Sequence, residues 1–94
     1  MNEYEEIFAS VLFFWNNFAS ANGYKQHAKI KNDIKRKIRS RLKAEPDFLS
    51  KIPTYFELIH RNLDGRNEFG RRLDLYEFLR STVLLSAMRK DGVK

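Results

Sequence analysis

The sequence contains no cysteine, which excludes disulfide bonds, thiol catalysis and zinc or iron–sulfur sites held by cysteine. It also contains no apolar run near the roughly 20 residues that a membrane-spanning helix requires. The N-terminal stretch is acidic and its apolar residues are interrupted, unlike those of a secretory signal peptide. From these absences we expect a soluble, cytoplasmic protein with no membrane segment.

Glycine and proline are also scarce, with four and two residues respectively in a chain of 94. Between them, apolar residues recur every three or four positions, which is the spacing of helices and not the alternation of strands. Hydrophobic residues make up 43% of the chain, enough to form a core. We therefore expect one all-α domain covering residues 1–94.

The predicted architecture is a compact bundle of four main helices. Capping boxes, in which a polar side chain and a glutamate three residues later satisfy the first amides, indicate three of the helix starts. They are Asn2 with Glu5, Thr54 with Glu57, and Asp74 with Glu77. The main helices are expected at about 3–21, 24–44, 54–63 and 75–90, with room for single helical turns near 48–52 and 66–70.

Positive charge is absent from the first 23 residues and concentrated in the segment that follows. Residues 25–43 contain nine Lys or Arg and one acid, Asp33, a local charge of +8, whereas the whole chain carries +6. On a helix, the apolar residues of this segment would form a narrow edge opposite a broad cationic face. The edge consists of Ile30, Ile34, Ile38 and Leu42. Surface helices normally interleave acids with bases, so this face is the strongest functional signal.

Nucleic-acid phosphates require closely spaced Lys and Arg, and we predict a small non-enzymatic protein that binds DNA or RNA through this helix. Three later arginines are expected to add secondary contacts. The predicted contact residues are Lys25, Lys29, Asn32, Lys35, Arg36, Arg39, Lys43, Arg66, Arg71 and Arg72. Asn32, Ser40 and the arginines are of types that read base edges if the helix enters a major groove. Gly23 between two predicted helices also permits a helix-turn-helix, although an Asn-Gly joint more often makes an antiparallel hairpin.

An adaptor or inhibitor that docks on an acidic protein surface is the second hypothesis, since the same cationic face suits either partner. Five large apolar residues fall outside the expected core stripes and are candidates for a protein interface or a homodimer. They are Phe13, Phe78, Leu84, Leu85 and Met88. The last predicted helix is apolar nearly all round, so it is either the centre of the bundle or shared with another chain.

The residues of an enzyme site are not assembled in any recognisable pattern. His27 and His60 lie on different predicted helices, with no serine or acid at the spacing of a catalytic triad. The acids are scattered and offer no paired carboxylates for metal-assisted or glycoside hydrolysis. We predict no enzymatic activity, no cofactor, no metal site and no small-molecule substrate.

Overall fold

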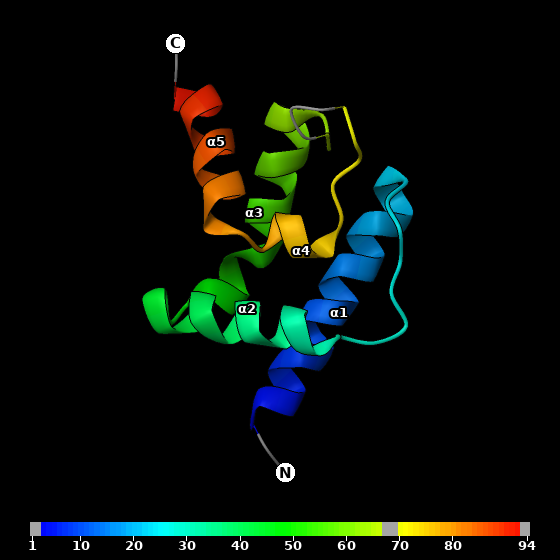
Figure 1. The fold of residues 1–94 in the computed structure, drawn as a ribbon, viewed down its shortest axis with the longest axis vertical. Coiled ribbons are helices and arrows are strands. Elements are labelled where there is room, and N and C mark those ends of the chain that lie inside the picture. Colours follow the sequence, from blue (N-terminus) through cyan, green and yellow to red (C-terminus); the bar gives the residue numbers. More distant parts are fainter. Residues whose placement is uncertain (1–2, 67–69, 93–94) are drawn as a thin grey trace.

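Five helices form the fold in the computed structural model, which describes residues 3–66 and 70–92 (Figure 1). They are α1 (Glu3–Asn22), α2 (Asn32–Ala44), α3 (Phe48–Leu63), α4 (Leu75–Phe78) and α5 (Ser81–Gly92). The described chain contains no strand, and the prediction of a compact all-α fold is confirmed. In these residues no helix combines the length and the apolar character needed to cross a membrane.

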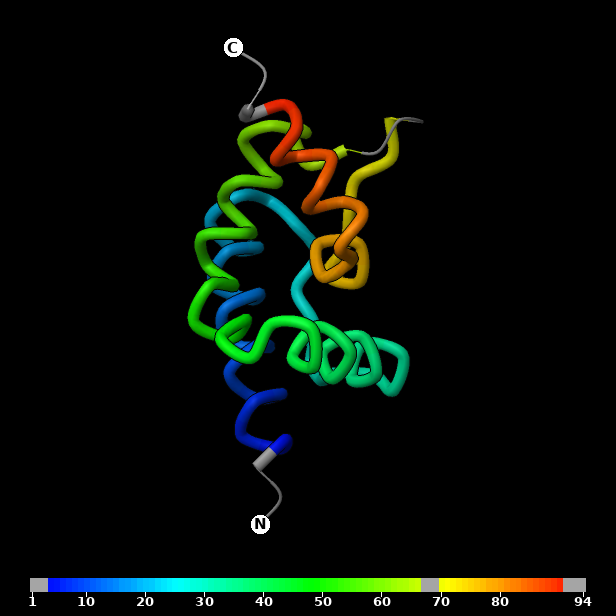
Figure 2. The backbone as a smooth tube through the Cα atoms, turned by 90° about the vertical axis from the view of Figure 1, so that its left-hand side faces the viewer, coloured from blue at the N-terminus to red at the C-terminus, as the bar shows by residue number. Residues whose placement is uncertain are grey.

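The helices are arranged in two layers. Figure 2 shows α1 and α3 on one side of the molecule and α2, α4 and α5 on the other. The α3 helix packs against both α1 and α5, so it connects the two layers. The α2 helix crosses in front of α1 and the start of α3 (Figure 1), which leaves one long side of α2 facing outward.

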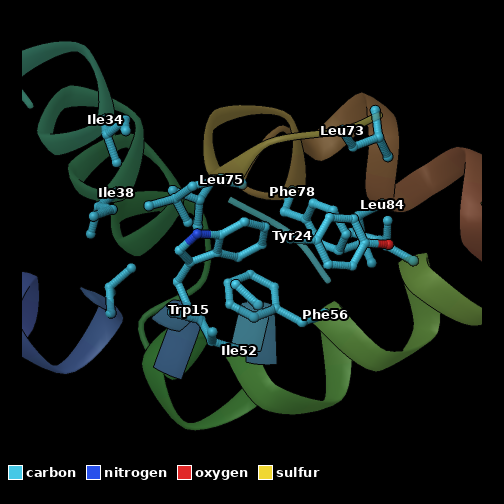
Figure 3. Close-up of a cluster of buried hydrophobic side chains, with 14 of the residues drawn as sticks. Trp15, Tyr24, Ile34, Ile38, Ile52, Phe56, Leu73, Leu75, Phe78 and Leu84 are labelled. Carbon is cyan, nitrogen blue, oxygen red and sulfur yellow. The ribbon is translucent and has the colours of Figure 1, made fainter. Parts of the chain in front are cut away.

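An aromatic cluster around Trp15 fills the space between the layers. The Trp15 ring is fully buried and makes edge contacts with Phe56 of α3 and Phe78 of α4, at centroid distances of 5.5 and 5.1 Å. Tyr24 completes the cluster at 5.6 Å from Trp15 (Figure 3). Such aromatic pairs add about 0.5–1.5 kcal/mol each beyond the apolar area that they bury. The cluster therefore joins α1, α3 and α4 in one core.

Phe78 and Leu84 belong to this core, and their prediction as protein-interface residues is wrong. Their side chains are only 2% and 6% exposed. The predicted helix at 75–90 is in fact two helices, because the chain breaks after Phe78. The break changes the direction of the helix axis, so a single helical wheel over 75–90 assigns these residues to the wrong side. The Asp74–Glu77 capping box is confirmed as the start of α4.

The boundaries of α1 and α3 can also be compared with the predicted ones. Helix α1 matches the predicted 3–21, but Asn2 of its capping box lies outside the described residues, as do 67–69 of the turn expected at 66–70. The predicted segments 48–52 and 54–63 are one helix, α3, which continues through Pro53, so the predicted cap at Thr54 is wrong.

Burial explains why α3 tolerates a proline in its interior. An internal proline costs about 3 kcal/mol because it lacks the amide hydrogen and its ring crowds the preceding turn. Apolar side chains on both sides of Pro53 are fully buried, and each contributes about 1.5–3 kcal/mol. They are Phe48, Ile52, Phe56 and Ile59. Together they outweigh the cost of Pro53, whose own ring is exposed.

Arg41 is the one charged residue buried in the described chain, and it joins three elements. Its guanidinium stacks 4.3 Å from the Phe48 ring centroid and donates a 2.8 Å hydrogen bond from Nη1 to the carbonyl of Leu79. Leu79 is the C-cap residue that follows α4. Burial lowers the pKa of Arg41, while nearby Glu45, 3.7 Å from Nη2, opposes that shift. An arginine nevertheless stays charged in a protein, so Arg41 holds the joint between α4 and α5 against α2.

Glu45 extends this interaction into the turn between α2 and α3. The Tyr55 hydroxyl and Lys51 Nζ both donate to Glu45 Oε2, and the pKa of Glu45 is lowered mainly by the Tyr55 hydrogen bond. Lys51 Nζ also lies 3.2 Å from Asp47. The acids of this turn therefore have structural cations as partners.

We expect Arg41→Ala to lower the free energy of unfolding by about 2–3 kcal/mol, because it leaves the buried Leu79 carbonyl without a donor and opens space beside Phe48. Arg36→Ala removes the same charge from an exposed position of α2 and should change stability by no more than about 0.5 kcal/mol. Urea unfolding followed by circular dichroism measures both. Equal effects of the two substitutions would show that Arg41 is not a structural residue.

Candidate nucleic-acid interface

Residues 24–31, which we call the connector, run from α1 to α2 without forming a helix. Side chains of α1 form hydrogen bonds with the backbone of the connector. Trp15 Nε1 donates to the Lys25 carbonyl at 2.8 Å, and Asn16 both donates to the carbonyl of His27 and accepts from its amide, at 2.8 and 2.9 Å. These groups would otherwise bond within a helix. The prediction of a helix over 24–44 is therefore wrong for 24–31 and confirmed for α2.

The connector also contacts α3, the start of α4 and the segment between them. His27 Nε2 donates to Asp74 at the start of α4, at 2.8 Å. The Tyr24 hydroxyl shares a 2.7 Å hydrogen bond with His60 Nδ1, and burial raises the pKa of Tyr24. The backbone of Gly65 lies so close that a Cβ there would overlap the Tyr24 hydroxyl. Both histidines therefore have structural partners. Because residues 24–31 are not helical, a helix-turn-helix centred on Gly23 is not formed.

Helix α2 turns an apolar edge inward and a polar face outward. Ile34, Ile38 and Arg41 are buried, as the isoleucine repeat predicted for the first two. Because successive helical residues are about 100° apart, the exposed polar residues fall within roughly a third of the circumference. Apart from the exposed acid Asp33, they are Asn32, Arg36, Arg39, Ser40 and Lys43, which we call the α2 face. Lys25, Lys29 and Lys31 of the connector are exposed as well, and we call all eight residues together with Lys35 the cationic surface.

Aromatic rings support the cations on the two flanks of α2. On the α1 side, Lys35 Nζ lies 5.4 Å from the Phe8 centroid, and the Arg39 guanidinium lies 5.5 Å from Phe8 and from Tyr4. On the α4 side, Lys37 Nζ lies 5.7 Å from the Tyr76 centroid. Cation–π contacts of this kind are worth about 0.5–1 kcal/mol at exposed sites. They restrict these long side chains without neutralising their charge.

Across residues 3–66 and 70–92, the cations of this surface form no ion pair. The ion pairs between basic side chains and acids in this part of the chain involve His27, Arg41 and Lys51 instead. Asp33, the one acid between residues 25 and 43, accepts a hydrogen bond from the amide of Ile34 at 2.9 Å. The cationic surface is therefore a region of net positive charge that faces solvent, with exposed Asp33 as the one acid of its sequence segment.

Two shallow grooves run along the flanks of α2. One has a volume of about 340 Å³ and is lined by Lys29, Lys31 and Lys35, together with Ile30 and Asn32. The other, of about 410 Å³, is lined by Asp33, Arg36, Lys37, Ser40 and Tyr76. Because each groove lies beside a different flank, the outward side of α2 is a ridge with cations on both sides.

The predicted contact residues divide into two groups. Lys25 and Lys29 lie on the connector, and the predicted residues from Asn32 to Lys43 lie along α2. Arg66 and Arg71 lie in the segment between α3 and α4, away from α2 (Figure 1). Arg72 is used in the fold, since it donates to the Asn22 carbonyl at 2.7 Å and stacks 4.3 Å from the Tyr24 centroid. The three arginines are not brought to the α2 face.

Sequence reasoning missed Lys31 as a surface cation, because on a continuous helix it would lie beside the apolar edge. Because α2 begins at Asn32, Lys31 precedes the helix and does not lie beside its apolar edge. Lys37 was not predicted as a contact residue either, and it lines the second groove. Neither position carries a signal in the sequence beyond its charge.

Three of the predicted apolar interface residues are exposed. Phe13 is 63% exposed on the outer side of α1, and Leu85 and Met88 of α5 are 51% and 48% exposed.

Among the described residues, no three His, Asp or Glu side chains gather closely enough to hold a metal ion. No family model, curated protein or solved structure matches the chain.

Proposed function

We propose that the protein is a small non-enzymatic nucleic-acid-binding protein whose cationic surface contacts the phosphate backbone. The observation that carries this proposal is the lack of any acid paired with that surface among the described residues. A duplex carries one negative charge per about 1.7 Å of its axis, and each phosphate that a cation neutralises releases counterions. The proposal includes a cytoplasmic location.

The distribution of acids supports the proposal further. Glu45 and Asp47 could in principle neutralise basic residues of α2, but they bind Arg41 and Lys51 at the turn into α3. Exposed Glu5 and Glu6 lie on α1 and form no ion pair with the basic residues of α2 in the described chain. Anionic partners are thereby directed to one side of the molecule.

Charge reversal on the α2 face tests the proposal. Arg36 and Lys43 are both exposed and have no ion pair in the described chain, so Arg36→Glu/Lys43→Glu should fold normally. We expect this variant to bind a labelled DNA duplex at least tenfold more weakly, and the slope of log K against log salt to fall by at least about one. Fluorescence anisotropy at several salt concentrations measures both quantities.

The matched control is Arg89→Glu/Lys90→Glu, which makes the same change of charge on the exposed side of α5. Its affinity should remain within about threefold of the wild type, because long-range effects of surface charge are screened over about 8–10 Å at physiological salt. Equal losses for the two variants would mean that total charge, and not the α2 face, causes binding. Salt-independent binding would contradict a phosphate contact altogether.

A second candidate, an adaptor or inhibitor that binds protein, is favoured by the exposure of Phe13. Its ring is 63% exposed and stands among polar and small residues on α1. A large aromatic residue of this kind is a common anchor in protein interfaces. The same residue could serve a homodimer, in which the two copies of α1 would meet.

Phe13→Ser separates these possibilities at low risk to the fold, because an exposed ring contributes little to stability. If Phe13 mediates a homodimer, the wild type should be dimeric and Phe13→Ser monomeric by size-exclusion chromatography with light scattering. Leu85→Ser is the control from the other exposed apolar site. A monomeric wild type at about 100 μM, well above the Kd of a stable dimer, would exclude the homodimer.

A further inference from the structure

We infer that the nucleic acid is double-stranded B-form DNA and that α2 enters its major groove. This inference rests on the proposed function, because it specifies the partner of the same cationic surface. It depends on three observations: the ridge shape of α2, the placement of cations relative to polar side chains on it, and the orientation of nearby aromatic rings.

The ridge has the dimensions of a groove-binding helix. The 13 residues of α2 extend about 20 Å, and an α-helix with its side chains is about 10–12 Å wide. The major groove of B-DNA is about 12 Å wide and admits one helix. The α2 helix crosses in front of α1 and has one long side outward (Figure 1).

Two neutral polar residues and one arginine form a row along the ridge. Asn32, Arg36 and Ser40 are spaced four residues apart, so they follow one another along the outermost side of α2. Asparagine and arginine can make bidentate contacts with adenine and guanine respectively, and serine can bond with several base edges. These three residues are therefore placed to contact bases at the floor of a groove.

The flanking cations are placed for the two strands that form the walls. Lys29, Lys31 and Lys35 line the groove on one flank of α2, and Lys37 lines the groove on the other together with Arg36 and the acid Asp33. A helix in the major groove has a phosphate backbone on each side, and phosphate contacts on both sides fix its register. A surface that binds a single strand needs cations along only one track.

The aromatic rings argue against single-stranded partners. Unpaired bases bind mainly by stacking on exposed aromatic side chains. In the described part of the chain, the rings near α2 lie beneath cations: Phe8 and Tyr4 under Arg39, and Tyr76 under Lys37. Phe13 is the exposed ring among the described aromatics, and it lies on the outer side of α1. Duplex RNA is also disfavoured, because its deep and narrow major groove does not admit side chains on a helix.

The test uses the full chain and four labelled probes of equal length: a DNA duplex, its single strand, the RNA duplex, and a DNA duplex with glucosylated hydroxymethyl groups on cytosine C5. Those groups project into the major groove. We expect the unmodified DNA duplex to bind at least tenfold more tightly than each of the other three at the same salt concentration.

Asn32→Ala provides a second readout, because it changes no charge and Asn32 makes no side-chain hydrogen bond within the described chain. Loss of a base contact should weaken binding to the unmodified duplex by about fivefold or more without changing the salt slope. Asn17→Ala, the same substitution on the exposed side of α1, should leave the affinity unchanged.

Three results would overturn the inference. They are equal affinity for duplex and single strand, insensitivity to the glucosyl groups, and equal affinity for RNA and DNA duplexes. In each of these cases salt-dependent binding would still support the proposed function. Absence of salt-dependent binding to all four probes would overturn the proposed function and this inference together.

Discussion

The hydrogen bonds from Trp15 and Asn16 to the backbone of the connector are the interactions on which the rest of the structure depends. Trp15 is at the centre of the aromatic core, so its hydrogen bond to the Lys25 carbonyl joins the connector to that core. Asn16 satisfies both backbone groups of His27. Because these residues hold 24–31 extended along α1, the helix begins only at Asn32 and lies across the bundle with one side outward.

The structure also separates cations that stabilise the fold from cations that are available to a partner. Arg41 is buried against Phe48 and the Leu79 carbonyl, and Lys51 is paired with the acids of the turn between α2 and α3. Glu45 and Asp47, which follow the end of α2, are therefore already paired with Arg41 and Lys51. The positive charge of the cationic surface is thus a consequence of how the turn is built, as well as of the number of bases in residues 25–43. Its concentration on one ridge gives the proposed DNA contact its geometry.

Local patterns predicted what local interactions determine. The inward isoleucines of α2, the cap of α4 and the exposure of Phe13 all follow from spacing along the chain. The remaining features depend on contacts between distant residues. Ile30 continues the four-residue repeat of the isoleucines, so nothing in the repeat reveals that 24–31 is held by α1. Likewise, the break after Phe78 coincides with a hydrogen bond from Arg41, 38 positions away in the sequence. The face of α2 was therefore predictable, but the path that leads to it was not.

The most direct test of this account is amide hydrogen exchange of the connector in Asn16→Ala, with Asn17→Ala as control. The amide of His27 donates to Asn16 Oδ1, whereas Asn17 is exposed on the neighbouring position of α1. If these hydrogen bonds hold the connector, Asn16→Ala should increase exchange at His27 and the adjacent connector amides at least tenfold, with α3 little affected, and Asn17→Ala should match the wild type. Unchanged protection of the connector in Asn16→Ala would show that the fastening to α1 does not hold it in place.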